Sequence, residues 1–297
     1  MSNRRMWIVA GVLMLAVVAV SAHLTTTTEE YSRYNIQWNG TSGCVERFIK
    51  SGAVEVHETA SLEGHRNALL VIIAPAGSYT PAEIERYRAF LEQGNSILLA
   101  DDDGSGNQLL GELGSSIRLV PGNVSGAERS YTDPGAVTGR RCSDHPLLTN
   151  CTALQFNHPG TVTGGTALIR TSPLSWIDQN GNGRIDPGEP QGGYTLCSRE
   201  NAGSGEIIVL ADPSIFINAM LAIDGEVDNA RFLRQVTGAY PSVLLDQTRS
   251  RTASGGDVID GISAVRSSPW RVLIAGLVVL PAIIIFGRRK TEESDNA

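Results

Sequence analysis

Runs of hydrophobic residues separated by turn-forming residues predict a series of strands in the central part of the chain. The apolar runs at 68–74 (ALLVIIA) and 96–100 (SILLA) are typical of strands buried on both faces of a parallel sheet. Shorter runs complete the series. We expect strands at 34–38, 53–58, 68–74, 96–100, 206–211 and 243–246.

Helical periodicity alternates with these strands. Between the two buried runs, Thr80 is a suitable N-cap, Pro81 occupies the first helical position and Gly94 follows the last turn. The apolar residues between them recur at helical spacing and form one stripe, made of Ile84, Tyr87, Phe90 and Leu91. Comparable signals predict helices at 41–50, 215–221 and 228–236.

The alternation of strands and helices predicts an α/β fold with a doubly wound, mostly parallel, flavodoxin-like sheet and right-handed crossovers. Residues 121–200 differ, because they are rich in Gly, Pro and Thr, and we expect them to form an irregular β-rich insertion. The whole domain is expected to span 23–248. A polar, Gly- and Ser-rich linker at 249–269 follows it.

Two apolar segments, 6–22 and 270–287, flank this domain, and basic residues stand at the outer end of each. By the positive-inside rule they predict a two-pass protein of the cell membrane, with both termini (1–5 and 288–297) cytoplasmic and the main domain extracytoplasmic. The membrane is therefore one expected partner. The small residues Val20-Ser21-Ala22 leave open the alternative that the first segment is a cleaved signal peptide.

The charge balance narrows the classes of partner. The chain has 24 basic and 31 acidic residues, for a net charge of -7. Most of the acidic residues lie between the two apolar segments. An acidic domain is a poor match for nucleic acid or for anionic lipid, so we expect no nucleic-acid partner.

The four cysteines all lie in the central domain, where an oxidising compartment would favour disulfides. Three pairings are possible. The short loop between Cys142 and Cys151 favours that bridge, which leaves Cys44 with Cys197. A zinc site is the alternative, but the chain has no C-x-x-C motif. Three sequons also make glycosylation possible at Asn39, Asn123 and Asn150.

Residues 178–189 fit the calcium-loop pattern D-x-[DN]-x-[DN]-G-x5-E at every fixed position. Gly183 stands where such a loop bends. The expected ligands are Asp178, Asn180, Asn182, the backbone carbonyl of Arg184, Asp186 and Glu189. No long helix can flank the loop, so we expect structural calcium that orders the insertion. The alternative is an Asn- and Gly-rich surface turn that only resembles a calcium loop.

Five further stretches are informative together: 80–114, 170–178, 211–218, 228–233 and 242–247. They resemble the membrane-anchored family called domain of unknown function 4350. The resemblance implies a fold similar to class I glutamine amidotransferases. It also implies a complex with other membrane proteins and a MoxR-type ATPase system as partners.

An amidotransferase needs a nucleophilic cysteine on a tight turn between a strand and a helix. The corresponding turn here, ADDDGSGN at 100–107, has no cysteine, and its carboxylates oppose the formation of an oxyanion. The turn could cap the following helix, or it could bind a ligand or cation. The residues available for either role are Asp101, Asp102, Asp103, Ser105 and Asn107.

Two functions follow from these observations. The missing nucleophile favours a non-catalytic binding or scaffold domain of unknown ligand, tethered to the membrane and stabilised by calcium and disulfides. The alternative is a membrane-tethered hydrolase with its active site at the turn 101–107, at the carboxyl end of a strand.

Overall fold

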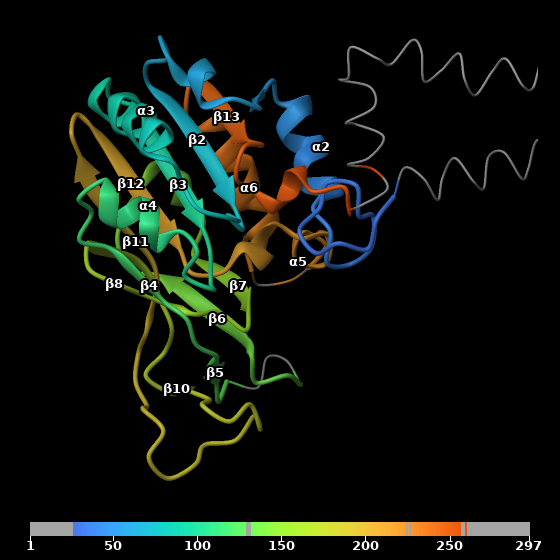
Figure 1. Ribbon diagram of the computed structural model, residues 1–297. Helices are drawn as coiled ribbons and strands as arrows, with labels where there is room; N and C mark the ends of the chain where they lie inside the picture. The colour runs from blue at the N-terminus through green and yellow to red at the C-terminus, as the bar shows by residue number, and fades with distance from the viewer. Residues whose placement is uncertain (1–25, 129–131, 224, 226, 257–258, 260–297) are drawn as a thin grey trace, which may run out of the picture. The chain divides into compact units, whose positions relative to one another are not determined.

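The buried apolar runs form the centre of one large sheet in the computed structural model of the chain (Figure 1). The structure describes residues 26–128, 132–223, 225, 227–256 and 259. Two units are distinguished, Thr28–Ser254 and the two ends of the chain, Met1–Thr27 with Gly255–Ala297. All the elements described below belong to the first unit.

Nine strands make up this sheet. In spatial order they are β1 (Val54–Val56), β13 (Ser242–Asp246), β2 (Ala68–Ile73), β3 (Ser96–Ala100), β12 (Gly205–Leu210), β11 (Thr195–Ala202), β9 (Thr166–Arg170), β6 (Ala136–Arg141) and β7 (Ala153–Asn157). From β1 to β12 the neighbours pair in parallel. From β12 to β7 they pair antiparallel.

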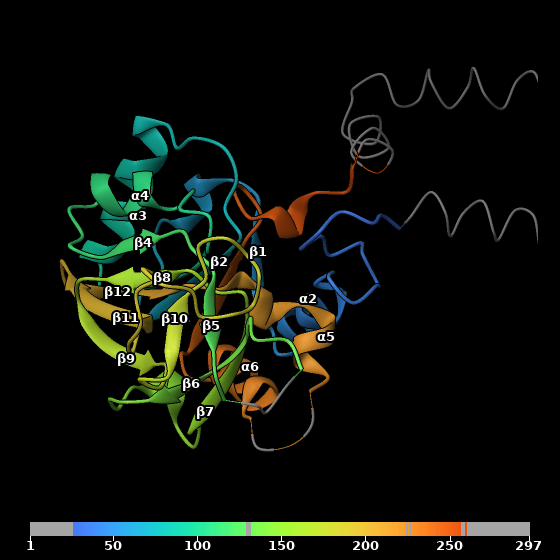
Figure 2. The same cartoon turned by 90° about the horizontal axis from the view of Figure 1, so that it is seen from below.

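Helices cover both faces of the parallel half of the sheet, as Figures 1 and 2 both show. One face packs against α3 (Pro81–Glu92) and α4 (Asn107–Glu112). The other packs against α2 (Ser42–Lys50), α5 (Asn218–Leu221) and α6 (Asn229–Gly238). Short 3-10 helices connect them: η1 (Thr59–Leu62), η2 (Pro146–Leu148), η3 (Pro213–Phe216) and η4 (Arg251–Ala253).

The prediction of a doubly wound, mostly parallel sheet is therefore wrong. The sheet is mixed, with as many antiparallel as parallel pairings between neighbouring strands. The reason lies in residues 121–200, whose strands β6, β7, β9 and β11 extend the main sheet from β12. Because antiparallel neighbours need no helical crossover, this half of the sheet carries few helices.

The remaining strands form two small antiparallel sheets. In one, β10 (Ser175–Ile177) pairs with β5 (Val124–Gly126), and in the other, β4 (Arg118–Val120) pairs with β8 (Thr161–Thr163). The loop after β10 extends beyond the main sheet at the bottom of Figure 1.

The strands and the helix predicted at the centre of the sheet, β2, β3 and α3, are confirmed. Every residue of β2 and β3 is buried, and α3 begins with a capping box in which Thr80 and Glu83 satisfy each other's backbone N–H groups. The strand expected at 34–38 is wrong. The Asn35 side chain accepts the N–H of Gln37 and donates to Glu29 O, which stabilises a turn instead.

The prediction of a two-pass membrane protein also needs correction. Within the described ranges, no helix is both long and apolar enough to cross a membrane. The segments 6–22 and 270–287, on which that prediction rested, lie outside the described residues.

The predicted disulfides are wrong as well, because all four cysteines are free. Cys142 is exposed and its thiol lies 3.4 Å from Ala167 O, whereas Cys151 is buried in the core. The short loop between them does not bring their sulfurs together. Cys44 in α2 and Cys197 in β11 are buried as ordinary apolar side chains.

Candidate functional site

The loop expected to bind calcium uses its polar groups to hold its own backbone. One Asp178 oxygen accepts the N–H of Gly181 (2.8 Å) and the other that of Gly183 (2.7 Å). Glu189 likewise accepts the N–H groups of Gln179 and Asp186. These are the bonds of an Asx-rich turn.

The other expected ligands behave in the same way. The amides of Asn180 and Asn182 both donate to Asp186 Oδ2 at 2.7 Å, and Arg184 N–H donates to Asn182 Oδ1. In the part of the chain that the structure describes, no group of three or more His, Cys, Asp or Glu side chains could hold a metal ion. The calcium prediction is therefore wrong.

The turn after β3 carries a buried carboxylate and no cysteine. Asp101 follows the last residue of β3 and is almost completely buried. It accepts the N–H of Asp103 at 3.1 Å and that of Gly106 at 2.7 Å. Both bonds close the turn on itself, so the Asp101 oxygens face the backbone of their own turn.

The remaining residues of this turn contact neighbouring segments. Asp103 accepts the N–H of Ser105 at 2.8 Å and pairs with Arg251 at 3.0 Å. The Asn107 side chain exchanges two hydrogen bonds with the backbone of Leu119 in β4. The turn is thereby attached to β4 and to the segment after β13.

A second buried carboxylate follows the adjacent strand β12. Asp212 is fully buried and accepts the N–H groups of Asn157 and Ser214, each at 2.6 Å. The Tyr31 hydroxyl lies 3.2 Å from Ser214 Oγ. The ends of β3 and β12 therefore carry a cluster of acidic and phenolic groups, which we call the acidic edge (Tyr31, Asp101, Asp102, Asp212).

Burial determines how these groups titrate. It raises the pKa of Asp101 to about 7, against the opposing hydrogen bond from Gly106. Burial and the negative charge of Asp103 raise the pKa of Asp102 to about 6. Burial also raises the pKa of Asp212 to about 7, although its N–H donors favour the ionised form. For Tyr31, burial raises the phenol pKa and the charge of Asp102 adds to this.

These pKa values predict that the domain loses stability as pH rises from about 4 to about 7. A carboxyl with a raised folded-state pKa holds its proton in the folded state over a range where the unfolded state has lost it, so the linkage slope is negative there. Groups with a lowered pKa, such as Glu206 and Asp228, act in the opposite sense only near and below pH 4. We expect the melting temperature to be lower at pH 7.5 than at pH 5, with a smaller difference in Asp212→Asn. Equal differences in both proteins would contradict the assignment.

The segment after β13 covers the neighbouring strand ends. Asp246 is fully buried, and its Oδ2 accepts the N–H groups of Arg249 and Ser250, both at 2.9 Å. Its Oδ1 accepts the Thr248 hydroxyl at 2.6 Å. From there the chain crosses the end of β2, where Arg251 N–H donates to Ala74 O and Ser250 Oγ accepts the N–H of Ile73. We call residues 247–254 the edge segment.

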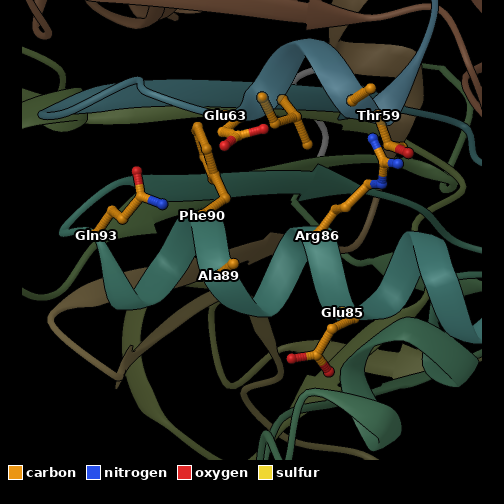
Figure 3. A pocket seen from close by; sticks show the side chains of 9 residues that line it. Thr59, Glu63, Glu85, Arg86, Ala89, Phe90 and Gln93 are labelled. Carbon is orange, nitrogen blue, oxygen red and sulfur yellow. The ribbon is translucent and has the colours of Figure 1, made fainter.

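An open groove runs beside this closed edge, between η1 and α3 (Figure 3). Its first part has a volume of about 400 Å³, with Ala89 and Phe90 of α3 on one side and Leu62 of η1 on the other. A second hollow of about 510 Å³ continues it towards the edge segment and shares Thr59, Ala60 and Arg86 with the first. We call the two together the η1–α3 groove.

Arg86 occupies the middle of this groove. Figure 3 shows the Arg86 side chain reaching from α3 towards Thr59, whereas the side chain of the preceding residue, Glu85, points away. Among the described residues Arg86 has no hydrogen-bond or ion-pair partner, while Glu83 on the same helix is paired with Arg249. No sequence pattern indicates this groove, because the stretch at 59–62 (TASL) shows no periodicity and the apolar stripe of α3 indicates only its buried face.

Two of the five histidines, His145 and His158, and the three sequon residues lie in unrelated places. His145 is buried and its Nε2 lies 3.2 Å from Glu206, whereas the exposed His158 contacts Asp133 and Asn123. Of the other two sequon residues, Asn39 accepts a hydrogen bond from Asn35, and Asn150 is exposed with a positive φ of 59°.

Comparison with known proteins identifies the family of the chain. Among solved structures, it is similar to the "mmIFT52 N-terminal domain" (17% identity, 65% of this chain and 86% of that chain, TM-score 0.47). It is also similar to a putative ThuA-like protein from Bacteroides uniformis (14%, 70% and 85%, TM-score 0.38) and to a β-galactosidase from Bacillus circulans sp. alkalophilus (12%, 61% and 26%, TM-score 0.36). At these TM-scores the similarities say nothing about function. The curated proteins include no match. The model of the family named Domain of unknown function (DUF4350) matches residues 33–237, and the chain belongs to that family.

Proposed function

We propose that this DUF4350 domain is a non-catalytic binding domain whose ligand occupies the η1–α3 groove. The observation that carries the proposal is the closure of the carboxyl edge of the parallel strands, the place where sheets of this kind usually hold their substrates. The edge segment, fixed by Asp246, lies across the ends of β13 and β2 and reaches the turn after β3 through the ion pair of Arg251 with Asp103.

The chemistry of the turn after β3 also supports a binding role. A covalent mechanism needs an activated nucleophile with a base within hydrogen-bond reach. At this position the chain has Asp101, which is buried and bonded to its own turn. The four cysteines lie in other elements or connections, and His145 uses Nδ1 to accept the N–H of Leu147 and Nε2 to contact Glu206.

The groove has the properties of a binding site. It combines an apolar stretch, made of Leu62, Ala89 and Phe90, with polar groups around it (Figure 3). Among these polar groups are Glu63, Arg86 and Gln93. Its volume of several hundred Å³ suits a small molecule or part of a peptide. The family resemblance implies a MoxR-type ATPase system as a partner. We propose that a protein of that system supplies the peptide that binds in the groove.

One observation favours an enzymatic alternative. Asp102 and Asp212 interact electrostatically, and burial raises the pKa of Asp102 to about 6 and that of Asp212 to about 7, within the range useful for acid–base catalysis. A hydrolase would then act at the acidic edge, with Asp102 the more accessible of the two carboxyl groups.

A turnover screen separates the two functions. The full chain would be incubated with amide, ester and glycoside substrates, alongside Asp102→Asn and Ser105→Ala. A binding domain gives the same background product in all three proteins. Turnover by the wild-type chain that disappears in Asp102→Asn, with the melting temperature unchanged, would overturn the proposal.

The groove is tested by nuclear magnetic resonance with a fragment library. We expect binding fragments to shift the amide signals of Thr59, Arg86 and Ala89, and Ala89→Trp to abolish these shifts by filling the groove. Shifts confined to residues 101–107 would place the ligand at the acidic edge instead.

A further inference from the structure

A hollow separate from the groove lies at the opposite end of the sheet. It is bounded by the end of β6, by η2, by the residues before β7 and by α6, and has a volume of about 840 Å³. Its wall includes Arg141, Thr149, Asn150, Thr152 and Arg231. We call it the arginine hollow. Its volume is far larger than a single inorganic ion needs and falls in the range of sites for organic molecules.

Both arginines can donate hydrogen bonds into the hollow. Among the described residues, Arg141 forms an ion pair only with Asp144, at 3.2 Å, and the Asp144 side chain is 97% exposed. A pair of this kind is readily exchanged for a better anion. Arg231 is held more firmly, because its Nη1 donates to Asn150 O at 2.7 Å and to Asp228 Oδ1 at 2.6 Å. Its Nε and Nη2 have no partner among the described residues.

Three arginines lie in or near the hollow, although the protein as a whole is acidic. The net charge of the whole chain is -7, yet three guanidinium groups act together on Cys151 beside the hollow. Burial, with the charge of Asp228, raises the pKa of the Cys151 thiol to about 11, and Arg231, Arg141 and Arg234 oppose that rise. The three cations are therefore close enough to act on one point, and two of them, Arg141 and Arg231, line the hollow itself.

The carboxylates beside the hollow other than Asp144 already have partners: Asp228 is bonded to Arg231 and Thr152, and Glu206 to His145. His145 is buried there, and its ring is fixed by the N–H of Leu147 on Nδ1 and by Glu206 on Nε2. Asp144 is thus the one exposed carboxylate among the lining residues, and it lies at the rim.

From this arrangement we infer that the arginine hollow binds a phosphate ester. Two planar guanidinium groups suit the several oxygens of one dianion, since each can donate a pair of parallel N–H bonds. The Thr149 hydroxyl adds a neutral donor on the same wall. The volume beyond the phosphate accommodates the organic part of the ligand. This inference does not depend on the η1–α3 groove.

Phenyl phosphate is a suitable probe, used with the full chain in calorimetric titrations at constant ionic strength. We expect saturable binding, weaker binding of inorganic phosphate and none of phenol. Arg141→Gln should weaken binding about tenfold, the loss of one charged hydrogen-bonding partner. Asp144→Asn should strengthen it about two- to threefold, because it removes the competing carboxylate. Arg184→Gln, in the exposed loop 178–189, is the matched control and should have no effect.

Several outcomes would overturn the inference. Binding that is unchanged in Arg141→Gln, or equally weakened in Arg184→Gln, would indicate attraction to basic residues in general. If benzoate bound as tightly as phenyl phosphate, the site would recognise a carboxylate as well as a phosphate, and the assignment to a phosphate ester would be wrong. Circular dichroism of Arg141→Gln, together with retained binding by Arg141→Lys at reduced strength, separates loss of the site from loss of the fold.

Discussion

Asp246→Ala is expected to lower the free energy of unfolding by about 3–4 kcal/mol, because it leaves several buried donors without an acceptor. Asp246 is fully buried and accepts the N–H groups of Arg249 and Ser250 as well as the hydroxyl of Thr248. Without it, the edge segment loses its attachment at the end of β13. Urea denaturation of the two proteins measures the effect, and limited proteolysis should show new cleavage within 247–254.

Asp144→Ala is the matched control for this substitution. Asp144 is also an aspartate, but it pairs with Arg141 at the surface and its side chain is 97% exposed. We expect its removal to change the free energy of unfolding by no more than about 0.5 kcal/mol. If Asp246→Ala were as mild as this control, Asp246 would not be what holds the edge segment.

Gly106→Ala is expected to destabilise the domain by about 1–3 kcal/mol through overpacking. An added Cβ would lie 2.6 Å from Leu99 Cδ2 and 3.2 Å from Asp101 Oδ2, so it disturbs both the β3 core and the bond that closes the turn. The φ of Gly106 is −72°, which alanine adopts freely, so contact and not backbone strain causes the loss.

The same substitution five residues later should have the opposite sign. Gly111 lies inside α4, and an added Cβ would meet only Arg118 Nη2 at 3.8 Å. Gly111→Ala should therefore raise the free energy of unfolding by about 0.5–1 kcal/mol through helix propensity. Thermal melts of both variants check the pair, and a stabilised Gly106→Ala would show that the turn after β3 is looser than described.

The parallel half of the sheet could be predicted because a strand that is buried on both faces has a continuous run of apolar residues. β2 and β3 are continuous apolar runs, and α3 has its cap, its first-turn proline and its stripe in order. The antiparallel half has no such run. The strand β6, for example, has the sequence AVTGRR and is only partly buried. Its place in the sheet depends on pairing with β7 and β9, which lie further along the chain and which the sequence pattern does not identify as its partners.

Polar residues misled the sequence reasoning for a physical reason. The Asp, Asn and Glu side chains at 178–189 are suitable ligands for calcium, but the same oxygens also accept backbone N–H groups in a glycine-rich turn. Residues 249–254 are polar enough for a linker, yet their N–H and hydroxyl groups serve the buried Asp246 and the end of β2. The polarity of a residue alone does not show whether its side chain faces water or a buried hydrogen-bond partner.

Hydrogen exchange at the carboxyl edge tests the central claim most directly, which is that the edge segment closes this edge. The relevant amides are those of Ile73, Ala76 and Ser250, bonded to Ser250 Oγ, Arg249 O and Asp246 Oδ2. If the edge is closed, these three amides exchange as slowly as the core of β2 and β3, and Asp246→Ala makes them exchange quickly. Exchange in the wild-type chain at the rate of an unstructured peptide would contradict the account, because the strand ends would then be open to a substrate.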